Sequence, residues 1–480
     1  MWFGLATYQR YTETQYPLPH RHQIAEPWSL RCLLRTACMP VDGVSRQELI
    51  NKPRARSELA ETPNRLSNLP EDRPLDLKVS PLGSLGLYEF RIVLVSFMVG
   101  FVGFQMRQAT NLWLIYDITK SPLSLGLLGV FQFAPMLILV FIGGSVADMV
   151  DRRKLLILTQ ASNFLLAIVL AGLALGGRIE VWHIYATTLV TAAVNTFEGP
   201  ARMAMLPSLV PRSHLMNAIT LNQAARHGSM LFGPALGGLL IGLVGPGWTY
   251  ATVALVFIPT VGVLFLLKPM PPDPEARRRG MSVSSMLEGF RFVLGTHVFL
   301  AMMLLDVVAM LFTHHRGLIP IFAEDILNAG EFGFGIMLSA PAAGFLIGSA
   351  ILLIAGDVRH KGIIVVGTYV AYMAAIAIFA SSTTYWISLL ALAAVGGLDG
   401  VGAIMRSTIL QGAVSDEIRG RATAVLQLSN RGGPSMGQLM LGAMAAVVSA
   451  PTSLLIGSVV GILTLVIVMS TVRSVATYKG

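Results

Sequence analysis

The chain has 480 residues, of which 54% are hydrophobic and only 13% charged, and it carries a formal net charge of +9. This charged fraction and the mean hydropathy of +0.65 exclude an ordinary soluble domain, in which about 25% of residues are charged. The positive charge does not indicate nucleic-acid binding, because Lys and Arg interrupt long apolar runs instead of gathering on one soluble face. The two cysteines have no histidine at ligand spacing, so we expect no metal site, and nothing in the sequence calls for a cofactor.

The first part of the chain differs in composition from the rest. Residues 1–80 carry 20 charged residues and eight prolines, whereas the remaining 400 residues carry only 41 charged residues. Mixed charge, repeated proline and the lack of a sustained 3.6-residue period are typical of disorder. We therefore predict a disordered cytoplasmic N-terminal extension over residues 1–84.

From residue 85 onward, apolar stretches of about 20 residues predict membrane-spanning helices. Twelve stretches are centred near residues 103, 134, 165, 191, 230, 258, 309, 344, 372, 395, 435 and 462. A segment with four prolines and three consecutive arginines separates the first six from the last six. The prediction is an all-α membrane protein with an N-terminal six-helix bundle (85–268), a cytoplasmic linker (269–296) and a C-terminal six-helix bundle (297–480).

The loops between these stretches differ in their content of Lys and Arg. If alternate loops are assigned to one side of the membrane, that side collects most of the cations, and the other side holds only Lys120, Arg178 and Arg316. By the positive-inside rule, both termini and the linker are predicted to be cytoplasmic.

The second half of the chain repeats the first. At an offset of 204 residues, Arg202 aligns with Arg406 and Gly238 with Gly442, and at an offset of 206, Gly129 aligns with Gly335. The recurring block lies on the same side of the membrane in both halves, so the two bundles are pseudo-symmetric parallel repeats. Such duplications place a substrate site between the halves, near the midplane.

The strongest local motif, GGSVADMVDRRK, lies between the second and third apolar stretches. Its candidate gating residues are Gly144, Asp148, Asp151, Arg152 and Arg153. Glycines let helix ends approach, an acidic group can accept hydrogen bonds from a neighbouring helix N-terminus, and cations anchor at anionic headgroups. The alternative is a solvated loop that merely obeys the positive-inside rule.

Two sets of six helices, a basic linker and GGSVADMVDRRK together resemble the major facilitator superfamily (MFS). The phrases WLIYDITKSPLSLGLLG, NTFEGPARMAMLPSLVPRSHLMNAITLNQ and LIPIFAEDIL are similar to its bacterial enterobactin-exporter-like branch, also called transmembrane secretion effectors. The resemblance covers about residues 85–475 and implies the MFS fold in the lipid bilayer of a bacterial inner (plasma) membrane. It also implies that Asp148 with Arg152 forms a cytoplasmic latch of the outward-facing state. Asp151 replaces a glycine usual in this signature, and the second copy at 356–361 is degraded, so the latch is assigned to the first half only.

Ionisable residues within the spans cost roughly 2.5 to 3.5 kcal/mol each on insertion scales, so each needs a partner or a function. They either form structural ion pairs or line the translocation path. The candidates for coupling or translocation are Arg107, Asn111, Glu198, Arg202, Arg226, Asp306, Asp399, Arg406 and Arg431.

Asp306 is the favoured candidate for proton coupling, because its helix face shows no cation within one turn. Asp399 is second, since Arg406 lies two turns away on the same face. The alternative for Asp306 is a permanent charge held by Arg107, Arg226 or Arg431 from another helix.

Three basic residues, His314, His315 and Arg316, follow near the outer end of the seventh stretch. They are expected to form a cluster at the membrane interface, and a pH-sensing role is the alternative.

Enzymatic functions find little support. No P-loop occurs, and the GPSMG sequence at 433–437, which has hydrolase-elbow spacing, is followed by no histidine that could act as a base. We therefore predict a monomeric secondary active transporter that exports a small-molecule substrate, amphipathic and siderophore- or drug-like, in exchange for protons by alternating access. The alternatives are an importer and a non-transporting membrane sensor or assembly factor with the same fold.

Overall fold

The computed structural model describes residues 82–268, 297–356, 358, 361–413 and 416–471, and within them every long element is a helix. The predicted extension up to residue 81 and the predicted linker over 269–296 lie outside these described residues.

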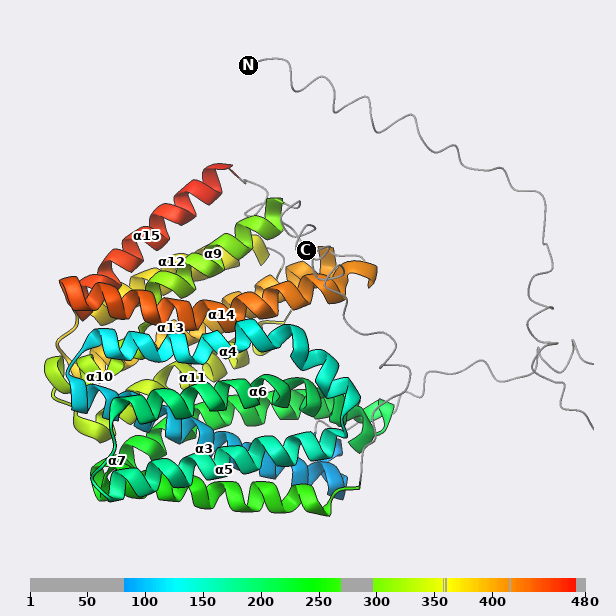
Figure 1. Cartoon of the computed structure of the whole chain (residues 1–480). Coiled ribbons are helices and arrows are strands. Elements are labelled where there is room, and N and C mark those ends of the chain that lie inside the picture. Colours follow the sequence, from blue (N-terminus) through cyan, green and yellow to red (C-terminus); the bar gives the residue numbers. More distant parts are fainter. Residues whose placement is uncertain (1–81, 269–296, 357, 359–360, 414–415, 472–480) are drawn as a thin grey trace, which may run out of the picture. The chain divides into compact units, whose positions relative to one another are not determined.

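Five long helices form the first part of the described chain (Figure 1). They are α3 (Tyr88–Thr119), α4 (Pro122–Met149), α5 (Arg152–Leu175), α6 (Val181–Leu209) and α7 (Leu215–Leu266), with the short turns η1 (Gly83–Gly86) and η2 (Arg212–His214). Gly245 interrupts α7 with φ 83° and ψ 169°, a backbone conformation that glycine alone adopts readily. As a result, α7 consists of two helical segments, which contain the predicted centres 230 and 258.

Six long helices follow after residue 296. They are α9 (His297–Thr313), α11 (Gly330–Ala355), α12 (Lys361–Ser381), α13 (Tyr385–Ala413), α14 (Asp416–Val448) and α15 (Ala450–Thr471). Between α9 and α11 the chain passes through the 3-10 turn η4 (His315–Leu318), the short α10 (Ile319–Ile321) and the π-helical turn η5 (Phe322–Ile326). All twelve predicted apolar centres therefore lie inside described helices.

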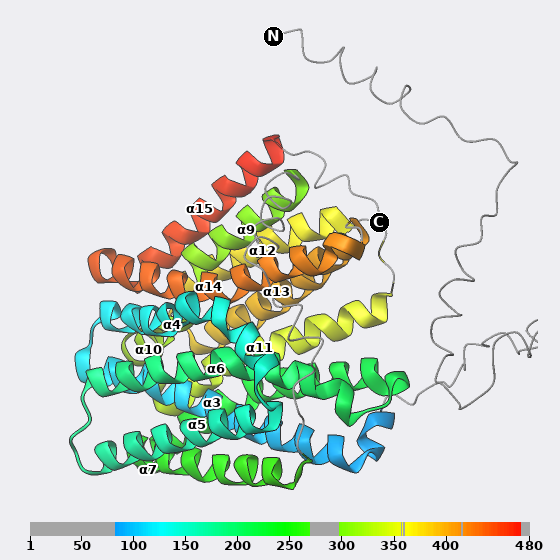
Figure 2. The same cartoon turned by 45° about the vertical axis from the view of Figure 1, so that its right-hand side comes forward.

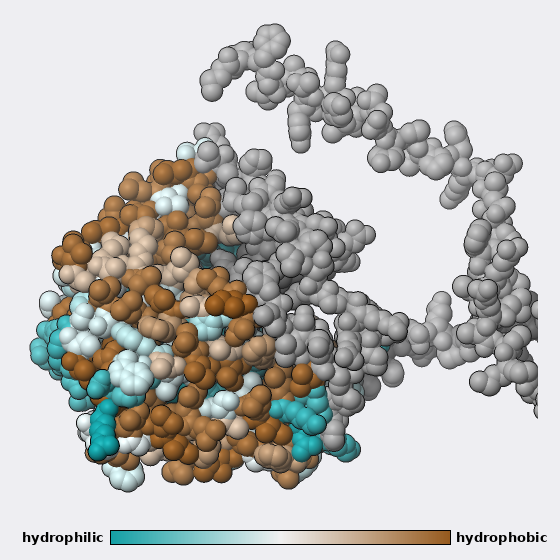
Figure 3. Space-filling view, viewed as in Figure 1, coloured by the Kyte–Doolittle hydropathy of each residue, from teal (hydrophilic) through white to brown (hydrophobic). Residues whose placement is uncertain are grey.

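The helices have the length and the surface of a membrane protein. Among the described residues, nine segments are long and apolar enough to cross a membrane, with α7 and its preceding turn counted as one segment of 55 residues. Figure 3 shows that the visible face of these helices is mostly hydrophobic. Large apolar side chains such as Leu353 and Ile354 are more than 80% exposed (83% and 86%), as expected where lipid replaces water. The chain is a multi-pass membrane protein.

Two helix pairs form the most extensive contacts between the first set of helices, α3 to α7, and the second set, α9 to α15. The pairs are α7 with α11 and α4 with α14, and we call them the two seams (Figure 2). A Cβ atom on Gly238 would lie 2.7 Å from the Cα of Gly335, and one on Gly442 would lie 2.6 Å from the Cα of Gly126. The sequence repeat aligns Gly238 with Gly442 and α11 with α4, so the two seams are equivalent contacts.

We predict that Gly238→Ala destabilises the protein, because the added methyl group has no room in the α7–α11 seam. Overpacking of this kind costs about 1–3 kcal/mol, more than the gain in helix propensity of about 1 kcal/mol. The control is Gly262→Ala in the same helix, where an added Cβ would meet no heavy atom within 4 Å. Thermal melting of both variants in detergent measures the difference, and equal melting temperatures would show that the seam is not closely packed.

Candidate functional site

A cavity of about 340 Å³ lies where α7 meets the helices and turns from α9 to α13. Its volume is within the range of about 300–1,000 Å³ that is usual for small-molecule sites. Apolar side chains, among them Met230, Met310 and Phe345, form much of the wall. The charged or titratable side chains on the wall are His227, Asp306, His314, His315, Arg316, Tyr369, Tyr372, Asp399 and Arg406.

Three charged side chains on this wall form one group, the Arg406 cluster. The Nη2 atom of Arg406 lies 3.0 Å from Oδ1 of Asp306 and 3.7 Å from Oδ1 of Asp399. Both carboxylates line the cavity, but the side chain of Asp306 is only 15% exposed, whereas that of Asp399 is 46% exposed. One guanidinium serves two carboxylates, so the cluster has a net charge of −1 when both carboxylates are ionised. Asp399 is the less tightly held of the two.

Asp306 therefore has a cationic partner from another helix. That partner is Arg406 of α13, which was not among the alternatives Arg107, Arg226 and Arg431 that the sequence left open. Helical periodicity reveals only neighbours on the same helix, and this contact joins α9 to α13. The side chain of Arg431 lies outside the described residues.

The expected interfacial cluster of His314, His315 and Arg316 is also wrong, because all three residues line the cavity. The prediction depended on their position near the outer end of the apolar stretch, but α9 ends at Thr313 and the tighter turn η4 follows. His315 is 8% exposed, and its Nδ1 atom lies 3.3 Å from the carbonyl oxygen of Thr313.

Arg107 and Asn111 of α3 are not on the cavity wall but in buried polar networks of the first set of helices. Arg107, 2% exposed, donates to Oδ1 of Asn163 at 3.1 Å, and Asn163 donates to Asn195 at 3.1 Å. Asn111 accepts a hydrogen bond of 2.8 Å from the hydroxyl of Tyr250. These contacts tie α3 to α5, α6 and α7, which supports a structural role for both residues.

Glu198 of α6 lies among cations, as the ion-pair interpretation of the sequence expects. Arg202 and Arg226 and the side chain of Gln160 all interact with its carboxylate. The Arg202 guanidinium also lies 5.5 Å from the ring centroid of Phe97, a cation–π contact. A structural ion pair of Glu198 stays a prediction.

The described part of the loop motif holds helix ends together. Asp151 caps α5, since its Oδ1 accepts a hydrogen bond of 2.9 Å from the backbone N–H of Arg153. The Arg153 side chain donates to the carbonyls of Leu264 and Phe265 at 2.8 Å each, at the end of α7, where carbonyls have no partner within the helix.

Arg152 makes a similar contact, from its Nη1 atom to the carbonyl oxygen of Ala204 in α6 at 3.0 Å. Gly144 and Asp148 belong to α4, but side-chain contacts there lie outside the described residues. The latch between Asp148 and Arg152 stays a prediction.

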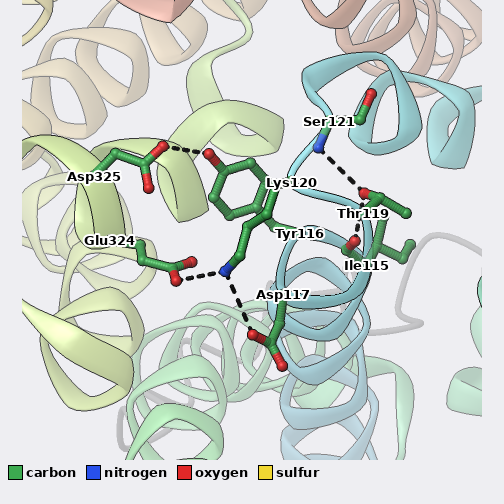
Figure 4. Close-up of polar contacts among 8 residues, drawn as sticks. All are labelled: Ile115, Tyr116, Asp117, Thr119, Lys120, Ser121, Glu324 and Asp325. Atoms are coloured by element: carbon green, nitrogen blue, oxygen red, sulfur yellow. Dashed lines mark hydrogen bonds and ion pairs between the residues drawn. The ribbon is translucent and has the colours of Figure 1, made fainter.

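A group of contacts that the sequence did not predict joins the end of α3 to η5 (Figure 4). Lys120 Nζ lies 2.5 Å from Oε1 of Glu324 and 3.4 Å from Oδ1 of Asp117. The Tyr116 hydroxyl donates to the carboxylate of Asp325. We call the two bonds from α3 to η5 the Lys120 contact. Both bonds depend on the π-helical turn η5, and π-helical turns are rare and often occur at functional sites. Hydrophobic periodicity does not reveal such a turn. The one feature of the sequence that could have pointed to these contacts is the acidic pair in LIPIFAEDIL.

The charge of Lys120 is stable in this position. Partial burial by itself lowers the pKa of the ammonium, but the hydrogen bond and charge of Glu324, together with Asp117, outweigh it and raise the pKa above the usual value of 10.5. Because the pKa of Lys120 is raised in the folded protein, its contribution to the stability of the fold is complete at pH values below the ordinary pKa. This contribution disappears only as the pH rises through the raised pKa. The Lys120 side of the contact is thus charged throughout the physiological range.

The sequence and the fold both match known transporters. A sequence profile of the family described as transmembrane secretion effector matches residues 79–478. The enterobactin exporter EntS of Shigella boydii serotype 18 is 26% identical over 368 residues, which cover 76% of this chain and 87% of the exporter, and EntS of Escherichia coli O1:K1 has the same identity and coverage.

Solved structures share the fold. The nucleoside transporter NupG, 15% identical, gives a TM-score of 0.58 over 82% of this chain and 100% of its own. A POT family transporter in complex with 5-aminolevulinic acid, 11% identical, gives 0.65 over 80% of this chain and 96% of its own. With helices long enough to span a membrane, a small-molecule cavity and a family match over most of its length, the chain belongs to the transmembrane secretion effector family, which consists of transporters of the major facilitator type and not of enzymes.

Proposed function

We propose that this protein exports small amphipathic compounds, siderophore- or drug-like, across a bacterial inner (plasma) membrane in exchange for protons. The observation that carries the proposal is the Arg406 cluster, which places two carboxylates and one guanidinium on the wall of a cavity inside an apolar helix assembly. Charge in such surroundings is costly and is typical of substrate and proton pathways.

The proposed architecture has twelve membrane crossings in two six-helix halves, residues 85–268 and 297–480, working as a monomer. Its support is the break at Gly245, which divides α7 into two crossings, and the equivalence of the two seams. In this arrangement α6 and α14 also cross the membrane. The halves rock about the seams and expose the cavity to one side at a time.

The proposed orientation places the Lys120 contact at the external end, because the loops on the opposite side carry most of the cations. The external end is then closed in this conformation, since the Lys120 contact joins α3 of the first half to η5 of the second. Both termini and the linker are cytoplasmic. In the outward-facing state, Asp148 with Arg152 forms the cytoplasmic latch.

Asp399 is the proposed proton-coupling residue, in place of Asp306. Arg406 lies 0.7 Å closer to Asp306 than to Asp399 (3.0 against 3.7 Å), and Asp399 is the more exposed of the two carboxylates on the cavity wall. Protonation of Asp399 leaves one carboxylate opposite one guanidinium and removes the net charge of the cluster. The protein passes more easily through the occluded state between its two orientations when the cluster is neutral, because a buried net charge is costly.

The export direction and the chemical class of the substrate come from the relatives, which are named as exporters of enterobactin. Import is the alternative for direction. The alternative from another functional class is a membrane sensor with the same fold, which would bind a compound in the cavity without transporting it across the membrane.

The function is tested by transport in proteoliposomes with an imposed pH gradient. Enterobactin and a panel of drug-like amphipathic compounds are offered to the cytoplasmic face, and accumulation that requires the gradient and ends on addition of a protonophore is expected. Accumulation in the opposite direction would make the protein an importer. Binding of a compound without flux would leave only the sensor.

We predict that Asp399→Asn abolishes uphill transport and leaves downhill exchange measurable, because the amide keeps the shape of the side chain but cannot take up a proton. The comparison variant is Asp306→Asn, which removes the tight partner of Arg406 and is expected to slow both modes. Uphill accumulation by Asp399→Asn with the pH dependence of the wild type would exclude Asp399 as the coupling residue.

We further predict that Glu324→Gln opens the external end, while Asp117→Asn does not. Both variants remove one ion pair of Lys120, but only the first pair joins the two halves. A partly exposed pair contributes roughly 0.2–1 kcal/mol, so the open population should rise by up to about fivefold. Spin-label distances between positions 118 and 332 in nanodiscs measure this population, and equal distributions in the two variants would count against an external gate here.

A further inference from the structure

We infer that Arg316 recognises an acidic group of the transported compound, so that the substrate is an amphipathic anion. The inference rests on the proposed function, because it identifies the ligand of the cavity with the transported compound.

Arg316 is a cation on the cavity wall without an anionic partner. It belongs to η4 and lines the cavity. In the described part of the chain, no carboxylate oxygen lies within 4.0 Å of its guanidinium. The titratable groups beside it on the wall are His314 and His315, and an imidazole cannot supply the negative charge that would compensate a guanidinium. A cation in these surroundings needs an anion or water from the cavity itself.

Other arginines inside the described helices have partners from the chain. Arg107 donates to Asn163, Arg202 and Arg226 interact with Glu198, and Arg406 pairs with Asp306. Each of these arginines thus has a polar or charged group of the chain nearby. The different situation of Arg316 indicates that its partner comes from outside the chain.

The remainder of the wall suits the rest of such a compound. The carboxylates of the cavity belong to the Arg406 cluster, so they do not neutralise Arg316 at short range. Met310 and Phe345 offer an apolar surface for an aromatic or aliphatic body. The hydroxyl of Tyr369 is buried and has no hydrogen-bond partner among the described residues, which leaves it free for a second polar group of the ligand.

The test compares two fluorescent compounds that differ in charge, dansylglycine and its neutral amide, dansylglycinamide. Binding to the full chain in lipid nanodiscs is measured at neutral pH, with empty nanodiscs subtracted. The wild type should bind the acid more tightly than the amide. Arg316→Gln should weaken binding of the acid by roughly tenfold or more, the usual effect of losing a charged hydrogen bond, and leave the amide unchanged.

Two further variants separate charge recognition from damage to the fold. Arg316→Lys keeps the charge and should retain part of the preference for the acid. Arg178→Gln removes an exposed cation from the loop between α5 and α6 and should behave like the wild type. Equal binding of acid and amide by the wild type, no binding of the acid, or an unchanged preference in Arg316→Gln would each overturn the inference.

The outcome is distinguishable from failure of the proposed function. If the acid binds through Arg316 but no compound moves across proteoliposomes, the transport proposal fails and the recognition site stands. If compounds are transported and Arg316→Gln transports acids and neutral analogues like the wild type, the transport proposal stands and the recognition site fails.

Discussion

A charge inside a membrane-spanning helix must be compensated by the protein, because lipid tails cannot solvate it. The Arg406 cluster meets this requirement incompletely, since one guanidinium faces two carboxylates at 3.0 and 3.7 Å. Both carboxylates line the cavity, and the less tightly held one, Asp399, is the more exposed. In the proposed mechanism, a proton on Asp399 completes the compensation and so couples protonation of the cluster to the ease with which the helices around it can move.

The glycine seams and the Lys120 contact determine where such motion can occur. At the seams the backbones approach so closely that a single Cβ atom would collide, and the two seams are related by the sequence repeat. At the end of α3 the halves are joined by one ion pair and one hydrogen bond, which are weak enough to break during a transport cycle. In the proposed exchange, export of an anion and entry of a proton both move net positive charge into the cell, so an inside-negative membrane potential would favour each of these steps.

Much of the fold can be predicted from local properties of the sequence, but the arrangement of side chains around the cavity can be predicted only in part. Hydropathy locates all twelve apolar centres inside helices, because apolar content along the chain is what the membrane selects. The spacing of Asp399 and Arg406 on one helix face also predicts their proximity. The pairing of Asp306 with Arg406 cannot be predicted in this way, since it depends on how α9 and α13 pack. Lys120 and Glu324 are 204 residues apart and meet only because a π-helical turn follows α9 and α10.

The central claim is that the cavity opens to the two sides of the membrane in turn. Thr368 of α12 lines the cavity, and in a chain without Cys32 and Cys38 a cysteine at this position reports access to it. The labelling rate of Thr368→Cys with a membrane-impermeant thiol reagent is measured in right-side-out and in everted vesicles, with and without Glu324→Gln. We expect faster labelling from the cytoplasmic side when the Lys120 contact is intact and a gain in labelling from the external side when it is broken. Labelling from one side only, at a rate that Glu324→Gln does not change, would contradict alternating access.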